Sequence, residues 1–142
     1  MRHLLPITFL FTLLLLAACG STAPTQTSNA PAAAPGPGFA TISVSDLKAR
    51  LESETPPRVL DVRTPEEFVQ DRHIPGATLI PLQELGSRMG ELTDKNEPIA
   101  CFCRSGNRST TACQQLAAAG YTNLVNVEGG INAWKAAGYP VE

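Results

Sequence analysis

The seven residues from Cys103 to Ser109, Cys-Arg-Ser-Gly-Asn-Arg-Ser, combine a nucleophile with two cations in one short polar segment. An apolar run precedes them and a run of helix-forming residues follows, so the segment is expected to join a strand to a helix. The start of a helix presents free backbone N–H groups and partial positive charge, and Gly106 lets the chain turn tightly there. A cysteine in this position, between Arg104 and Arg108, is expected to have a lowered pKa and to be largely thiolate. Such a thiolate beside an anion cradle is suited to attack an anionic sulfur donor and to hold the transferred sulfur covalently.

The elements that must position this segment alternate between short apolar runs and helical patterns. Thr64 as N-cap, with Pro65 at the first helical position and Glu67 two residues later, gives the clearest helix start. Strands alternating with helices predict an α/β fold, a parallel sheet with helices on both faces and its site beyond the carboxyl ends of the strands. The expected strands are 40–42, 58–62, 77–80, 98–102 and 123–127, and the expected helices are 43–51, 64 onward, 82–92, 109–119 and 131–137.

Composition limits the classes of function. The chain has 142 residues, enough for one domain with appendages, and its net charge of −2 gives no reason to expect nucleic-acid binding. Four cysteines and two histidines lack the spacing of a structural zinc site, so no metal ligands are expected. The sequence carries no nucleotide or flavin signature either, so no cofactor is expected.

The N-terminal residues have the pattern of an export signal. A short basic start precedes an apolar run over 4–16, which is too short to span a bilayer comfortably and ends in small residues. The ending Leu-Ala-Ala-Cys resembles the lipobox of bacterial lipoproteins, which implies a signal peptide over 1–18 and lipid on Cys19. Residues 19–38 then form a Pro/Ala/Ser/Thr/Gly linker that cannot bury a core, so the folded domain is expected over 39–142. We therefore expect a protein outside the cytoplasm that is lipid-anchored to a bacterial membrane, the outer one if the cell has two.

The segment 103–109 resembles the active-site loop of rhodanese-like domains. Supporting segments follow in the family's order along the chain: Leu60-Asp61-Val62-Arg63, Glu66-Glu67-Phe68, His73-Ile74-Pro75-Gly76-Ala77 and Gly129-Gly130-Ile131-Asn132-Ala133-Trp134. The resemblance covers essentially all of 39–142 and implies a three-layer fold with a five-stranded parallel sheet. It also implies transfer of sulfane sulfur through a persulfide on Cys103. Substrate binding would fall on Arg104, Ser105, Gly106, Asn107, Arg108 and Ser109. The chain departs from the family at Arg72, where a glycine is common.

Residues around the loop have more than one interpretation. Arg104 is expected to contact substrate, whereas Arg108 either does the same or holds loop carbonyls in place. Asp61 and Arg63, at the end of a neighbouring strand, support the site either by touching the loop or by structural hydrogen bonds. The remaining candidates are expected to be structural. Cys101 and Cys113 are expected to be packed thiols, and His73 is expected to order its turn. Trp134 is expected to cover the core from the last helix.

Three functions compete. A sulfurtransferase would take thiosulfate, polysulfide or a persulfide as the small anionic donor, and a thiol or a cyanide-type acceptor, acting as a monomer. A phosphatase or arsenate reductase would have a related loop, but those enzymes separate cysteine and arginine by five residues, whereas four lie between Cys103 and Arg108. That tighter ring favours a sulfur atom over a phosphoryl group. The third interpretation is a non-turnover sulfur-binding or protein-interaction module on the same scaffold.

Overall fold

The computed structural model describes residues 38–142. The predicted signal peptide (1–18), Cys19 and the predicted linker up to residue 37 lie outside the described residues. Within 38–142, no helix combines the length and the apolar character needed to cross a membrane.

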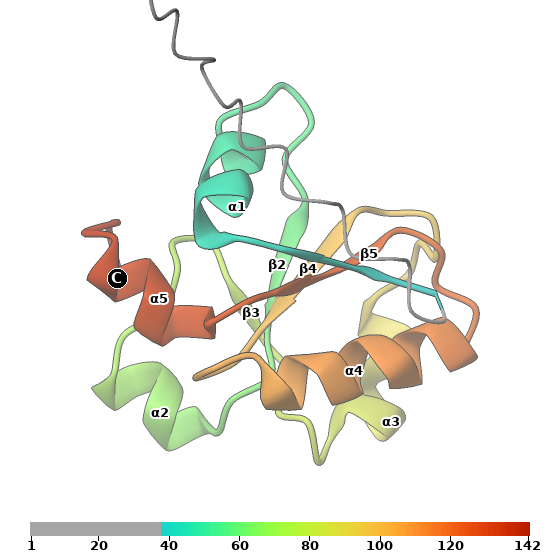
Figure 1. Ribbon diagram of the computed structural model, residues 1–142. Coiled ribbons are helices and arrows are strands. Elements are labelled where there is room, and N and C mark those ends of the chain that lie inside the picture. Colours follow the sequence, from blue (N-terminus) through green and yellow to red (C-terminus); the bar gives the residue numbers. More distant parts are fainter. Residues whose placement is uncertain (1–37) are drawn as a thin grey trace, which may run out of the picture. The chain divides into compact units, whose positions relative to one another are not determined.

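Five parallel strands form one sheet in the order β1-β5-β4-β2-β3. The central strand β4 (Ile99–Phe102) is buried along its whole length and pairs with β2 (Arg58–Asp61) on one side and β5 (Leu124–Val127) on the other. The short strands β1 (Ala40–Ile42) and β3 (Thr78–Leu79) lie at the two edges. Because all strands run the same way, their carboxyl ends meet at one edge of the sheet (Figure 1). Cys103 directly follows β4 at that edge.

Helices cover both faces of the sheet, as the sequence predicts. On one face α3 (Leu85–Arg88), the 3₁₀ turn η1 (Met89–Glu91) and α4 (Asn107–Ala118) bury a cluster that includes Leu85, Leu92, Leu116 and all three thiols of the described chain. On the other face α1 (Val44–Leu51) and α5 (Gly130–Ala136) bury a second cluster around Leu47 and Trp134. The fold is therefore the three-layer α/β arrangement with a five-stranded parallel sheet (Figure 1).

Two helix starts have side-chain caps, and the one at Thr64 confirms the prediction from the sequence. The Ser43 hydroxyl accepts from the Asp46 N–H ahead of α1, and Thr64 does the same from Glu67 ahead of α2 (Pro65–Gln70). In both cases the acidic side chain accepts in return from the backbone N–H of the cap, which satisfies two donors that a helix start otherwise leaves free. Pro65 occupies the first turn, where no N–H is needed.

Two helices differ from the sequence prediction. The expected helix over 82–92 is only the short α3 and η1, because Gly86 and Gly90 interrupt a stretch that has helical apolar spacing but weak helix propensity. The helix expected from Ser109 begins instead at Asn107, with Gly106 as a left-handed N-cap (φ 106°). Asn107 and Arg108 therefore belong to the first turn of α4 and not to a free loop.

Candidate active site

The Cys103 sulfur lies at the carboxyl end of β4, directly under the first turn of α4. The residue is 1% exposed, and its sulfur accepts a hydrogen bond from the Gly106 N–H at 3.2 Å. The Ser109 hydroxyl lies 3.6 Å from the same sulfur. Both donors come from the turn that the left-handed Gly106 creates, so the backbone geometry predicted for Gly106 is confirmed.

The surroundings lower the pKa of the Cys103 thiol. Burial acts in the opposite direction and favours the neutral thiol, but hydrogen bonds from Ser109, from its hydroxyl and its backbone, and from the Ser105 and Gly106 amides outweigh it. The predicted lowered pKa is thus confirmed, and its cause is mainly a set of hydrogen-bond donors on the loop and helix start. This arrangement can hold a thiolate or any anionic sulfur bonded to it.

The loop carbonyls are held by α5. The Ile131 N–H donates to the Cys103 carbonyl at 2.9 Å, and the Asn132 N–H donates to the Arg104 carbonyl at 3.2 Å. This contact requires close approach, since a Cβ on Gly130 would lie 2.2 Å from the Cys103 carbonyl oxygen. Gly130 also has a left-handed backbone (φ 54°), a conformation that glycine adopts without strain. The free N–H groups at the start of α5 therefore fix the backbone of the loop that begins at Cys103.

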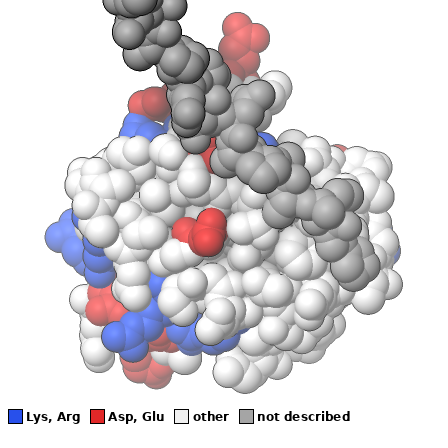
Figure 2. Space-filling model, in the orientation of Figure 1, with Lys and Arg blue, Asp and Glu red and all other residues white. Residues whose placement is uncertain are grey.

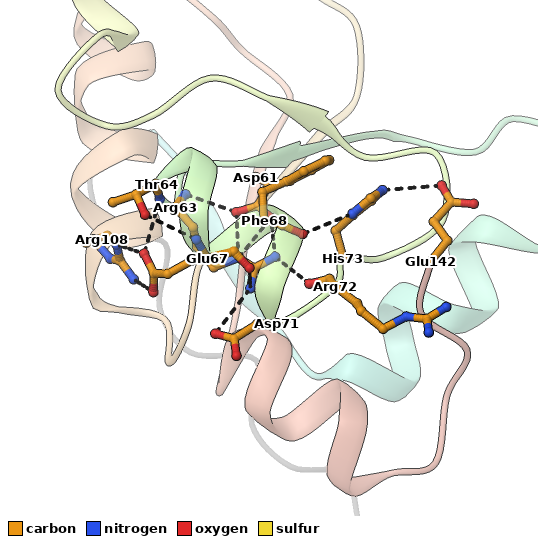
Figure 3. Close-up of polar contacts among 10 residues, drawn as sticks. All are labelled: Asp61, Arg63, Thr64, Glu67, Phe68, Asp71, Arg72, His73, Arg108 and Glu142. Atoms are coloured by element: carbon orange, nitrogen blue, oxygen red, sulfur yellow. Dashed lines mark hydrogen bonds and ion pairs between the residues drawn. The ribbon is translucent and has the colours of Figure 1, made fainter.

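Arg108 forms an ion pair with a residue that was not predicted as part of the site, Glu67. Its guanidinium forms two parallel hydrogen bonds to the Glu67 carboxylate of α2, at 2.6 and 2.7 Å (Figure 3). Holding loop carbonyls was one predicted role, and that prediction is wrong, because those carbonyls are bound by α5 amides and the guanidinium is engaged by Glu67. Arg108 holds the pKa of Glu67 at about 2, so this carboxylate stays charged. Contact between Arg108 and substrate stays a prediction.

The other predicted substrate-binding residues divide by exposure. Arg104, Ser105 and Asn107 are exposed, whereas Gly106 and Ser109 are buried against the sulfur. Within residues 38–142, the Arg104 side chain makes no hydrogen bond or ion pair, so its cation is available to an incoming anion. An exposed cation beside a set of loop amides can attract an anion.

Asp61 and Arg63 support the site without touching the loop. Both side chains are fully buried, and the Arg63 guanidinium binds both Asp61 carboxylate oxygens at 2.7 to 3.0 Å. The same guanidinium donates to the Glu67 carbonyl at 3.3 Å and to the Arg72 carbonyl at 2.8 Å (Figure 3). Of the two roles predicted for this pair, structural hydrogen bonding is the one found. Its effect reaches the loop through α2, which carries the Glu67 that holds Arg108.

The Arg72 turn explains the one departure from the family pattern. Arg72 has a left-handed backbone (φ 61°), where glycine is the least strained residue. Next to it, His73 stacks on Phe68 with ring centroids 3.7 Å apart, and its backbone exchanges two hydrogen bonds with Glu142. The prediction that His73 orders its turn is confirmed.

Cys101 and Cys113 are structural thiols, as predicted. Both are fully buried in the core cluster between the sheet and α4. The neighbouring Cys113 and burial raise the pKa of Cys101 well above its ordinary value. Neither thiol has the reactivity that the surroundings of Cys103 confer.

Charged side chains gather at this end of the visible surface. Figure 2, in the orientation of Figure 1, shows basic and acidic side chains side by side over α2 and toward the start of α4. The visible surface over the remainder of α4 carries little charge. The mixture fits the observed pairing of Arg63 with Asp61 and of Arg108 with Glu67.

The comparisons with known proteins agree with this geometry. Residues 43–137 match the rhodanese-like domain. The chain belongs to the rhodanese-like family. A sulfurtransferase of Allochromatium vinosum is 37% identical over 100 residues, which cover 70% of this chain and 92% of that protein. The thiosulfate sulfurtransferase PspE of Escherichia coli is 38% identical over 71 residues, which cover 49% of this chain and 67% of PspE. The crystal structure of a rhodanese-related protein from Thermoplasma volcanium superposes with a TM-score of 0.64 at 35% identity, covering 72% of this chain and 96% of that one.

Three residues of this rhodanese-like site were missed as functional residues by sequence reasoning. Glu67 was predicted as a helix-start residue and as part of the Glu66-Glu67-Phe68 segment, but not as the partner of Arg108. Gly130 was predicted only as part of the family motif. Its close approach to the Cys103 carbonyl oxygen was not predicted. Asn126 is a polar residue inside the otherwise apolar strand β5. A buried polar side chain needs a hydrogen-bond partner, so its place in an apolar run was a signal that could have indicated a polar contact, the one found with Ser109.

The Glu67–Arg108 pair predicts a specific dependence of stability on pH. Glu67 has a lowered pKa in the folded protein, so its contribution is present above its ordinary pKa of 4.5 and is lost as pH falls toward about 2. We expect Glu67→Gln to lower the free energy of unfolding by about 1 to 2 kcal/mol at pH 6, because the pair is bidentate but partly exposed. The difference between wild type and Glu67→Gln should shrink below pH 4.5. Urea unfolding at several pH values measures it, with Glu66→Gln on the same helical turn as the matched control. A pH-independent difference would contradict the pairing.

The close approach of α5 predicts unequal effects of two glycine substitutions. Gly130 and Gly138 both have a left-handed backbone, but a Cβ on Gly138 would meet nothing within 4 Å. Gly138→Ala should cost about 1 kcal/mol of unfolding free energy from backbone strain alone. Gly130→Ala should cost about 2 to 4 kcal/mol, because it adds a collision with the loop backbone. Equal losses for the two variants in urea unfolding would show that α5 does not hold the loop in this way.

Proposed function

We propose that the protein is a sulfurtransferase that moves sulfane sulfur through a persulfide on Cys103. The observation that carries the proposal is the set of donors around one buried sulfur: the Gly106 amide at 3.2 Å, the Ser109 hydroxyl at 3.6 Å and the Ser105 amide. These donors stabilise negative charge on sulfur, which the reaction requires before and after transfer. Relatives named sulfurtransferases support the same activity.

The reaction needs no oxidant and no cofactor. With thiosulfate as donor, the Cys103 thiolate attacks the outer sulfur, the sulfur–sulfur bond of thiosulfate breaks, and sulfite leaves with the bonding electron pair. The product is a Cys103 persulfide anion. An acceptor, either a thiolate or cyanide, then attacks the outer sulfur and restores the Cys103 thiolate. Polysulfide or another persulfide is an equivalent donor, with a shorter polysulfide or a thiolate as the leaving group.

The shape of the site favours sulfur over a phosphoryl group. Four residues separate Cys103 from Arg108, and the guanidinium of Arg108 is engaged by Glu67. The Cys103 residue is 1% exposed, which suits a small donor or the terminal sulfur of a persulfide. Arg104, exposed and unpaired within 38–142, is proposed to attract the anionic donor.

Persulfide loading is the direct test of the proposal. Reduced protein is incubated with thiosulfate or, separately, with polysulfide, and its intact mass is measured. We expect wild type to gain the mass of one sulfur atom, Cys103→Ser to gain none, and Cys113→Ser to load like wild type, because the loop donors surround the Cys103 sulfur. Subsequent addition of cyanide or a thiol should remove the sulfur.

The other outcomes separate the competing functions. Loading without release to any acceptor would indicate a sulfur-binding module and not a turnover enzyme. Absence of loading on fully reduced wild type would contradict sulfur transfer and favour an interaction module on this fold.

We further propose that lipid on Cys19 anchors the protein to a bacterial membrane outside the cytoplasm. The support is the apolar run followed by Leu-Ala-Ala-Cys in the sequence. Several acyl chains on one residue would bind a bilayer stably, because each buried methylene contributes about 0.8 kcal/mol.

Expression of the full chain in bacteria fed an alkyne fatty acid tests the anchor. Wild type should carry the label and fractionate with membranes, whereas Cys19→Ser should lose both properties. An unlabelled wild-type protein in the soluble fraction would contradict the anchor, and it would leave the chemistry of Cys103 unaffected.

A further inference from the structure

The terminal nitrogens of Arg108 are both bound by one carboxylate. Nη1 and Nη2 each donate to one oxygen of Glu67, at 2.6 and 2.7 Å. Two such N–H groups form the planar fork with which arginine binds a carboxylate, a phosphate or another oxyanion. An oxyanion that approached the same end of Arg108 would have to displace Glu67.

The Glu67 carboxylate is also held from the side of its own helix. Its Oε2 accepts the Thr64 N–H at 3.1 Å, within the capping box of α2 (Figure 3). The hydrogen bonds from Arg108 hold the pKa of Glu67 at about 2, so the carboxylate is charged at neutral pH. Glu67 therefore neutralises Arg108 from a fixed position.

Arg108 lies close to the Cys103 sulfur. It belongs to the first turn of α4 and directly precedes Ser109, whose hydroxyl lies 3.6 Å from that sulfur. The hydrogen bonds to Glu67 raise the pKa of Arg108 most, and the nearby Cys103 sulfur adds to the increase. A free guanidinium in this place could contact the oxygen atoms of a donor whose sulfur meets Cys103.

Sulfur donors differ in the group that is bonded to the transferred sulfur. In thiosulfate this group is a sulfonate, which presents three oxygen atoms and negative charge. In a persulfide or polysulfide the neighbouring atom is another sulfur, which presents no oxygen. A guanidinium fork beside Cys103 would therefore favour thiosulfate, and a fork already occupied by Glu67 removes that advantage.

We propose that Glu67 is a specificity-determining residue: by occupying the fork of Arg108, it withholds this cation from oxyanion donors and shifts the preference of the site from thiosulfate toward persulfides and polysulfides. The preference between donors rests on the proposed sulfur transfer. The weakened oxyanion binding rests on the Glu67–Arg108 geometry alone, so the two can be tested separately.

Sulfate binding to the reduced protein tests the occupied fork without any sulfur transfer. Sulfate is a dianion like thiosulfate but donates no sulfur, and it is titrated at constant ionic strength and pH 7 while the amide signals of 104–109 are followed. Glu67→Gln should bind sulfate about fivefold more tightly than wild type, because glutamine removes the charge and still suits a capping box. Glu66→Gln makes the same change of charge at an exposed residue that has no ion pair within 38–142, and it should stay within about twofold of wild type.

An Arg108→Gln background shows whether the gain comes from Arg108. We expect Glu67→Gln to tighten sulfate binding much less in this background than in protein that retains Arg108. An equal gain in both backgrounds would show that the removed repulsion alone is responsible and would overturn the proposal. Sulfate binding in Glu67→Gln that is unchanged or weaker than in wild type would also overturn it, and weaker binding would mean that Glu67 positions Arg108 for anions.

The preference between donors is measured from the rate of sulfur loading on Cys103 at low donor concentration. Rapid quenching and intact mass give the rate constants for thiosulfate and for 2-hydroxyethyl persulfide, and their ratio cancels any change in the amount of Cys103 thiolate. Glu67→Gln should raise the ratio of thiosulfate to persulfide about fivefold relative to Glu66→Gln. An unchanged ratio would contradict the role of Glu67 in donor choice. If Cys103 takes up no sulfur from either donor, the proposed function fails, and the sulfate titration still decides whether Glu67 occupies the fork.

Discussion

The site depends on one backbone contact, the capture of the Cys103 and Arg104 carbonyls by the first amides of α5. Each carbonyl shares a peptide plane with the N–H of the next residue, so the contact with α5 also fixes the directions of the Arg104 and Ser105 N–H groups. The next N–H group, that of Gly106, donates to the sulfur, and α4 starts at Asn107 with Ser109 in its first turn. The contact is possible because Gly130 has no Cβ at a point where one would lie 2.2 Å from the Cys103 carbonyl oxygen.

A second support for the loop is the ion pair between Arg108 and Glu67 of α2. The buried Asp61–Arg63 pair is bound to α2 and to the Arg72 turn, and α2 carries the carboxylate that holds Arg108 (Figure 3). Because Glu67 is also the capping-box residue of α2, one side chain connects the start of that helix to the start of α4. The Glu67–Arg108 pair is close to neutral, so Arg104 and the loop amides remain to attract an anion.

The sequence predicts the architecture well because most elements carry local chemistry that specifies them. The capping boxes at Ser43 and Thr64 and the apolar run of β4 each require only nearby residues, and all are found. The stretch 82–92 is where apolar spacing misleads, because spacing does not register the cost of two glycines in a short helix.

At the site, the place of Cys103 between a strand and a helix and the tight turn at Gly106 were predictable from residue types in order along the chain. The partner of Arg108 was not, because Glu67 is 41 residues away and already has a complete local role as a capping residue. The Asn126–Ser109 contact was beyond reach for the same reason: it requires the register of β5 beside β4 and the rotation of α4, neither of which a single segment encodes. Long-range polar contacts are thus the part of this site that needs the folded structure.

On the proposed mechanism, the amides of the loop and of the first turn of α4 hold the transferred sulfur. Comparison of ¹H–¹⁵N spectra of the reduced and the persulfidated protein tests this role of the amides. We expect the largest amide shifts within residues 104–109, where the N–H groups respond to charge on the outer sulfur. Spectra in which these amides are unchanged while a different region shifts would contradict it.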